Sequence, residues 1–204
     1  MIYDPEDATK NGFDGKNVST NHQLFKAIGP TEQTINMIMF HMMSDVTINL
    51  TTTTGDDKVD LTNAKMQLSN VYSTGKVLMG NGLVVPTGTA GIITNETATV
   101  GTYQTPWTYG FIPQSLENVV LTITTKDNNQ FFVAMNEVLA ATVGSTIIAN
   151  PYTLKNGKYV IDRWLPNYQY TYTFKLTKSG ITQISASLAD WENVEAGDDN
   201  VQIQ

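Results

Sequence analysis

Short runs in which apolar and polar residues alternate extend along most of the 204-residue chain. The clearest is the run 168–176, YQYTYTFKL, in which every second residue is aromatic or aliphatic. A period of two is typical of a strand with one buried face. The run 181–188, ITQISASL, alternates in the same way after the turn residues Ser179 and Gly180. The two runs therefore predict an antiparallel hairpin.

The same pattern recurs upstream, where Val46, Ile48 and Leu50 alternate with polar residues. A helix over 32–43 is an alternative for the segment before them, but the alternation that follows favours a long bent strand from Ile35. Further short runs, each bounded by turn residues, are 59–62, 66–71, 83–85, 91–94, 118–125 and 130–135. Many short strands without a fixed sequence period predict an all-β, antiparallel sandwich.

Three regions differ in character along the chain. Residues 1–34 are charged and rich in turn residues, so we interpret them as an N-terminal arm or the remnant of a preceding domain. Residues 35–193 form the predicted β-sandwich domain. Residues 194–204 form a C-terminal tail in which Val201 and Ile203 alternate with glutamines, a pattern that fits a strand given to a neighbouring molecule. A frayed terminus is the alternative for this tail.

Composition removes several classes of function. The chain has 12 basic against 19 acidic residues and a net charge of −7, so we expect no nucleic-acid partner and no binding to an anionic membrane. It has no cysteine, which excludes disulfides, thiolate metal sites and a cysteine nucleophile. The longest apolar stretch, Met37–Met43, is far shorter than the roughly 18 residues that a membrane-spanning helix needs. We therefore predict no transmembrane segment.

Candidate chemistry is sparse. The two histidines, His22 and His41, lack the spacing of a zinc motif, and we favour a strand position for His41 over a role as a general base. The acidic pairs 56–57 and 198–199 adjoin turn residues, which favours solvated turns over calcium ligands or a glycosidase pair. We predict no enzyme, no metal site and no cofactor.

Exposed aromatic rings are the remaining candidates for ligand binding. Trp107 and Tyr109 are close in the sequence, and their rings could stack on a sugar or contact a host protein. We favour core packing for such residues, because large aromatic side chains dominate the cores of sandwiches.

Several short motifs together resemble one family. The run Trp164–Tyr172, WLPNYQYTY, precedes a second strand that ends in Asp190–Trp191. It resembles the W-x-P-G-x-x-Y-x-Y…D-W ending of the fimbrillin-like proteins of Bacteroidales, the type V pilins. Phe40–Val46 is similar to the family's F-x-H-x-x-S-x-V strand, and Pro113–Gln114 is similar to its P-Q motif. Asn167 stands where the family usually has Gly, a change that Asn tolerates because it also adopts left-handed conformations.

This resemblance implies a transthyretin-like Greek-key sandwich and a structural or accessory subunit of a cell-surface fimbria. Its partners would be other fimbrial subunits, joined by β-strand addition through the tail that carries Val201 and Ile203, and a host glycan or host protein. It implies localisation at the cell surface, associated with the outer membrane after export, with the leader and the lipid-anchor site outside this sequence. The family's first domain is expected to be largely absent. The alternative is a monomeric cell-surface adhesin that uses Trp107 and Tyr109.

A protease step of the family also bears on this chain. In the family a trypsin-like protease cuts after an arginine near the start of the protein. Arg163 is the only arginine here and lies far downstream, so we expect no cleavage at an N-terminal arginine within this chain.

Overall fold

The computed structural model describes residues 41–78, 83–95, 105–140 and 152–190, which form fourteen strands and two short 3-10 helices. The helices are η2 (Gly55–Asp57) and η3 (Met135–Glu137). The strands are β1 (Ser44–Thr52), β2 (Lys65–Val71), β3 (Thr74–Leu78), β4 (Leu83–Thr87), β5 (Gly91–Thr94), β6 (Trp107–Phe111), β7 (Gln114–Ser115), β8 (Val120–Thr124), β9 (Gln130–Ala134), β10 (Tyr152–Lys155), β11 (Lys158–Ile161), β12 (Arg163–Trp164), β13 (Tyr168–Thr177) and β14 (Gly180–Asp190).

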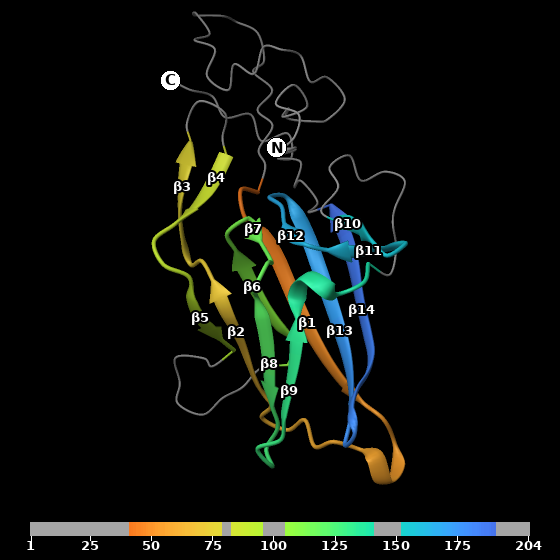
Figure 1. The fold of residues 1–204 in the computed structure, drawn as a ribbon. Coiled ribbons are helices and arrows are strands. Elements are labelled where there is room, and N and C mark those ends of the chain that lie inside the picture. The colour runs from red at the N-terminus through yellow and green to blue at the C-terminus, as the bar shows by residue number, and fades with distance from the viewer. Residues whose placement is uncertain (1–40, 79–82, 96–104, 141–151, 191–204) are drawn as a thin grey trace, which may run out of the picture.

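Two four-stranded sheets form the body of the molecule (Figure 1). One has the strand order β14-β13-β1-β6, and the other has the order β5-β2-β8-β9. Three two-stranded ladders, β3–β4, β7–β12 and β10–β11, extend them. The predicted all-β sandwich is confirmed. Its transthyretin-like Greek-key connectivity stays a prediction.

Antiparallel pairing dominates, with one exception among the described strands. β1 pairs with β13 in parallel, and Val46 lies opposite Tyr170. β13 and β14 form the predicted antiparallel hairpin, with a register shift between Lys175 and Leu176. β1 lies in the middle of this sheet, and both of its partners, β13 and β6, are distant in the sequence. No local turn therefore specifies its pairing.

The core lies between the two sheets and follows the alternation in the sequence. The inward residues of β13, from Tyr168 to Leu176, are buried together with Val46 and Ile48 of β1. From the other sheet, β2 and β8 contribute buried aliphatic side chains to the same cluster: Met66, Leu68, Leu121 and Ile123. Burying one face of each sheet is the main source of stability for such a sandwich.

The β3–β4 hairpin leaves this body. β2 is followed by β3, and β4 is followed by β5, so the four strands form one long two-stranded ribbon. Its β2–β5 half belongs to the sheet, and its β3–β4 half projects from the sheet. The register shifts between Ser69 and Val71, and Asn70 there has a φ of 61°. A bulge of this kind bends a strand and increases its twist, which accounts for the change of direction.

One predicted strand is wrong. Residues 59–62 form a turn segment outside any strand, although Val59 is buried. The N–H of Thr62 donates to the carboxylate of Asp60 at 2.9 Å, and the N–H of Val59 donates to Thr52 Oγ1 at 2.9 Å. Side chains therefore take the place of a partner strand.

Other predictions lie outside the described residues. These are the arm at 1–34, the start of the long strand at Ile35 and the tail at 194–204. The strand position predicted for His41 is wrong, because β1 begins only at Ser44 and the N–H of His41 donates to the side chain of Asn167 instead of to a partner strand. Among the helices of the described residues, none has the length and apolar character that crossing a membrane requires.

Candidate functional site at one end of the sandwich

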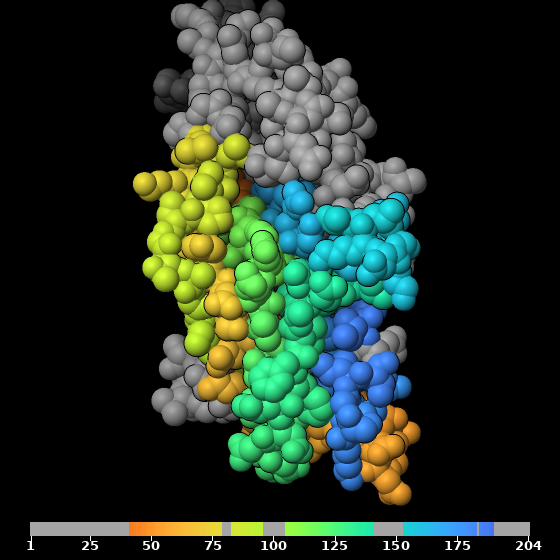
Figure 2. Space-filling model, viewed as in Figure 1, coloured from red at the N-terminus to blue at the C-terminus, as the bar shows by residue number. Residues whose placement is uncertain are grey.

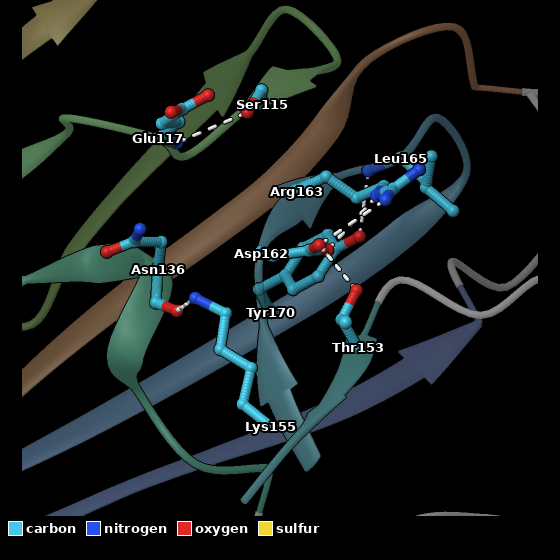
Figure 3. Close-up of polar contacts among 9 residues, drawn as sticks. All are labelled: Ser115, Glu117, Asn136, Thr153, Lys155, Asp162, Arg163, Leu165 and Tyr170. Carbon is cyan, nitrogen blue, oxygen red and sulfur yellow. Dashed lines mark hydrogen bonds and ion pairs between the residues drawn. The ribbon is translucent and has the colours of Figure 1, made fainter.

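The motif residues converge at the end of the sandwich where β12 leads into β13. Trp164 is 1% exposed, and its ring packs on Phe111 with 4.5 Å between the ring centroids. Its indole N–H donates to the hydroxyl of Tyr172 at 3.0 Å, and the N–H of Leu165 donates to the hydroxyl of Tyr170 at 2.8 Å (Figure 3 shows the second bond). Trp164, Tyr170 and Tyr172 thus make hydrogen bonds to polar groups that burial would otherwise leave without a partner.

These two tyrosines are held in their neutral form. Burial raises the pKa of Tyr170 well above its ordinary value, and burial also raises the pKa of Tyr172. The hydrogen bond from Trp164 lowers the pKa of Tyr172, but desolvation is the larger effect. The geometry supports a structural role for both phenols.

Asn167 joins this motif to the one around His41. It has a φ of 66°, which explains why glycine is usual at this position of the motif. Its N–H donates to the carbonyl of Met43 at 3.0 Å, and its side-chain oxygen accepts from the N–H of His41 at 3.2 Å. The buried hydroxyl of Ser44 donates to the carbonyl of Leu165 at 2.8 Å. Residues more than a hundred positions apart are therefore joined by three hydrogen bonds.

The side chain of Gln114, in the Pro113–Gln114 motif, makes the hydrogen bonds that the backbone of a neighbouring strand would otherwise make. Gln114 is 6% exposed, and its Oε1 accepts from the N–H of Tyr72 at 2.9 Å. Its Nε2 donates to the carbonyls of Tyr72 at 3.1 Å and Ile112 at 3.0 Å. The carboxamide pairs with Tyr72 as a peptide group would, at the point where β2 turns into β3. The sequence marked Gln114 as a motif position but did not indicate this role.

A second polar cluster holds the β10–β11 hairpin (Figure 3). The carboxylate of Asp162 accepts from Thr153 Oγ1 at 2.5 Å and from Arg163 Nε at 3.0 Å. Burial alone would raise the pKa of Asp162, but the bonds from Arg163 and Thr153 hold this pKa below its ordinary value. Lys155 contacts Glu137 at 3.0 Å and ties the hairpin to η3. The only arginine of the chain thus has an internal partner.

The two candidate ligand-facing aromatics differ in exposure. Trp107 is 4% exposed, so its ring belongs to the core, as the favoured alternative predicted, and it is not available to a ligand. Tyr109 lies opposite Val46 on the core-facing side of β6, yet it is 42% exposed. Among the described strands, β6 pairs with β1 alone, so one edge of β6 has no partner strand there, and the ring of Tyr109 is partly exposed.

The remaining candidates do not form a site in the described part of the chain. Val201 and Ile203 lie outside the described residues. Asp56 and Asp57 form the exposed turn η2, in agreement with the solvated turn that the sequence favoured. No group of three or more histidine or acidic side chains that could hold a metal ion is found within residues 41–78, 83–95, 105–140 and 152–190.

Comparison with known proteins decides the family. The model of the fimbrillin-like family matches residues 25–191, which is more than half of the chain. The chain is a member of the fimbrillin-like family. No curated protein sequence matches it.

Solved structures to which the chain is similar come from Bacteroides and Porphyromonas species. A "putative cell adhesion protein" from Bacteroides uniformis is 17% identical to the fimbrillin-like chain, with a TM-score of 0.53 over 75% of this chain and 52% of that one. The tip fimbrial protein Mfa3 from Porphyromonas gingivalis, with a C-terminal truncation, is 16% identical, with a TM-score of 0.47 over 74% of this chain and 52% of that one. The fimbrillin-like chain therefore matches about half the length of these proteins.

Proposed function

We propose that the chain is a structural or accessory subunit of a cell-surface fimbria that joins its neighbours by β-strand addition and takes part in adhesion. Family membership supports the fimbrial role. The observation that carries the assembly mechanism is the exposed, core-facing ring of Tyr109 on an outer strand.

The β6 edge has the properties of a strand acceptor. Val46, directly opposite Tyr109 on β1, is buried, and so are Trp107 and Phe111 on the same face of β6, so the exposed surface on this face of β6 is at Tyr109. An added strand would pair with the edge of β6 that has no partner among the described strands, and it would cover the ring of Tyr109 with its own side chains. Strand addition of this kind combines main-chain hydrogen bonds with pockets for alternate side chains.

The C-terminal tail is the proposed donor. Val201 and Ile203 are two residues apart, so in an extended conformation both point to the same side. They would pack beside Tyr109 while Gln202 and Gln204 face water. A donor from another copy of the chain would produce a polymer, and a donor from another fimbrial protein would produce a mixed fibre.

A cell-surface location and partnership with other fimbrial subunits follow from this proposal. An adhesive role would add a host glycan or protein as a further partner. The alternative, a monomeric adhesin, shares one observation with the fimbrial subunit, since the exposed ring of Tyr109 could equally contact a ligand. A fimbrial subunit that assembles by strand addition needs the tail as a donor strand, whereas a monomeric adhesin does not.

Polymer formation tests the proposal. We expect the full chain, concentrated before or after limited trypsin digestion, to form ladders on SDS gels that resist the detergent and disappear on heating. A variant that ends at Asn193, and a Tyr109→Ser variant, should remain monomeric. Monomer in every sample, or ladders that persist in the variant ending at Asn193, would contradict assembly through the tail and favour the monomeric adhesin.

A further inference from the structure

A pocket of about 660 Å³ lies between the β3–β4 hairpin and the segment around β7. Its lining comes from three parts of the chain: the end of β2, the end of β4 and the residues that begin with Gln114. The hairpin and the β6–β8 region lie next to each other on the face that Figure 2 shows. The pocket is separate from the tail, and neither Tyr109 nor any other residue of β6 lines it.

A bulge and several hydrogen bonds position the sides of this pocket. The bulge at Asn70 turns the hairpin away from the sheet, and the carboxamide of Gln114 holds Tyr72 at the bend through both of its backbone groups. Asn70 Nδ2 donates to the carbonyl of Asn118 at 2.7 Å, and both asparagines have positive φ, 61° and 65°. Two sides of the pocket are therefore connected before any ligand binds. Such pre-formed sites lose little conformational entropy on binding.

Three polar groups of the lining have no internal hydrogen-bond partner within the described residues. They are the hydroxyl of half-buried Tyr72 and two groups that face solvent, the carboxylate of Glu117 and the side-chain amide of Asn118. The backbone N–H of Glu117 is already bonded to Ser115 Oγ at 3.2 Å, which fixes the start of the loop and leaves the carboxylate exposed (Figure 3). A carboxylate, an amide and a phenol together supply acceptors and donors at one opening.

This set of groups fits the hydroxyls of a saccharide. Adjacent sugar hydroxyls each donate and accept, and a carboxylate acceptor makes the strongest of such bonds. The aromatic body of Tyr72 supplies apolar surface for the C–H face of a sugar ring. Glu117 is the only charged residue of the lining, so the pocket repels an anionic ligand. One carboxylate is too few for a calcium site, which needs six to eight oxygen ligands.

We propose that this pocket binds a neutral saccharide. Glu117 and Asn118 hold the hydroxyls, and Tyr72 supports the ring from the side of the hairpin. The site lies on the monomer and needs no polymer, so it goes beyond the proposed assembly and succeeds or fails independently of it.

Saturation-transfer NMR with the full chain tests the proposal. The probes are free neutral hexoses and N-acetylhexosamines at millimolar concentration, with N-acetylneuraminic acid, glucuronic acid and calcium chloride as separate samples. We expect a signal from at least one neutral sugar and none from the two acids. Glu117→Gln should weaken this binding about tenfold, because a neutral amide replaces a charged acceptor, and Tyr72→Phe should weaken it roughly threefold, because it removes the hydroxyl.

The matched control is Asp127→Asn, which removes an exposed carboxylate from the β8–β9 turn, outside the pocket. It should leave sugar binding unchanged, and none of the three substitutions should alter ladder formation. The absence of a signal from every neutral sugar would overturn the proposal. It would also be overturned by unchanged binding in Glu117→Gln and Tyr72→Phe, by binding of the acids alone, or by a response to calcium alone.

Discussion

A row of three aromatic rings in contact leads from a buried region of the molecule to an exposed one. The rings of Trp164 and Phe111 are 4.5 Å apart, and those of Phe111 and Tyr109 are 4.8 Å apart. The exposed fraction of these side chains is 1% for Trp164, 2% for Phe111 and 42% for Tyr109. The motif residues at the buried end have internal partners and serve the fold. The exposed end is one ring further along, on β6, which has no second partner strand among the strands that the structure describes.

Replacing the two outer rings of this row should separate fold from function. We expect Trp164→Ala to lower the free energy of unfolding by about 4 kcal/mol, because it removes a large buried side chain and the hydrogen bond to Tyr172. Tyr109→Ala should cost about 1 kcal/mol or less in the monomer, since its ring is already partly in water. Urea denaturation measures both values. Equal losses of unfolding free energy in the two variants would contradict the difference between the buried and the exposed ring.

Removal of the Gln114 carboxamide should have the next largest effect. Gln114→Met has a similar volume but leaves both backbone groups of Tyr72 without their partners. We expect a loss of about 2 to 3 kcal/mol in unfolding free energy, together with faster amide exchange at Tyr72. Gln130→Met, at an exposed position of β9, is the control and should be near neutral. A neutral Gln114→Met would show that the carboxamide does not hold the bend.

The buried phenols should make the unfolding free energy depend on pH at high pH. Burial raises the folded-state pKa of Tyr172 above its ordinary value of 10.0, so above this pH the unfolded chain loses protons that the folded chain keeps. Unfolding free energy should therefore be insensitive to these groups below about pH 9 and fall as the pH rises past 10. Tyr172→Phe should make this fall shallower and should itself cost about 1 kcal/mol at neutral pH. A slope that Tyr172→Phe leaves unchanged would contradict the assignment.

The smallest effect is expected at the Asp162 cluster, which is partly exposed. Arg163→Gln should cost less than about 1 kcal/mol at neutral pH. The lowered pKa of Asp162 means that its contribution is present above the ordinary value of 3.8 and is lost as the pH falls through the lower folded-state value. Asp162→Asn should remove this acid-dependent part. Unfolding curves at several pH values below 4 would measure it, and an unchanged pH dependence in Asp162→Asn would refute it.

Local patterns in the sequence predicted much of the fold. The runs 66–71, 91–94 and 168–176 coincide with β2, β5 and β13 to within a residue. Asn167 has the left-handed conformation that the motif implied. The turn at 59–62 was missed, because an Asp–Thr hydrogen bond replaced a ladder that the alternation resembled.

Features that depend on long-range contacts could not be read from the sequence. The parallel pairing of β1 with β13 joins segments far apart in the chain, and no turn residue encodes it. Trp107 and Tyr109 are two residues apart on one strand face, yet Trp107 is buried and Tyr109 is exposed, a difference that the alternation in the sequence does not indicate. The pocket between β4 and β7 likewise arises from the bend at Asn70, which has no signature beyond a residue type that tolerates positive φ.

Disulfide trapping tests strand addition at β6 most directly, because the chain has no cysteine of its own. Gly110 on β6 and Gly91 on β5 both have open space where a Cβ would be added. A Gln202→Cys chain mixed with a Gly110→Cys chain under mild oxidation should give a mixed disulfide-linked dimer, whereas a Gly91→Cys partner should not. Equal cross-linking of Gly110→Cys and Gly91→Cys, or none with either, would contradict strand addition of the tail at β6.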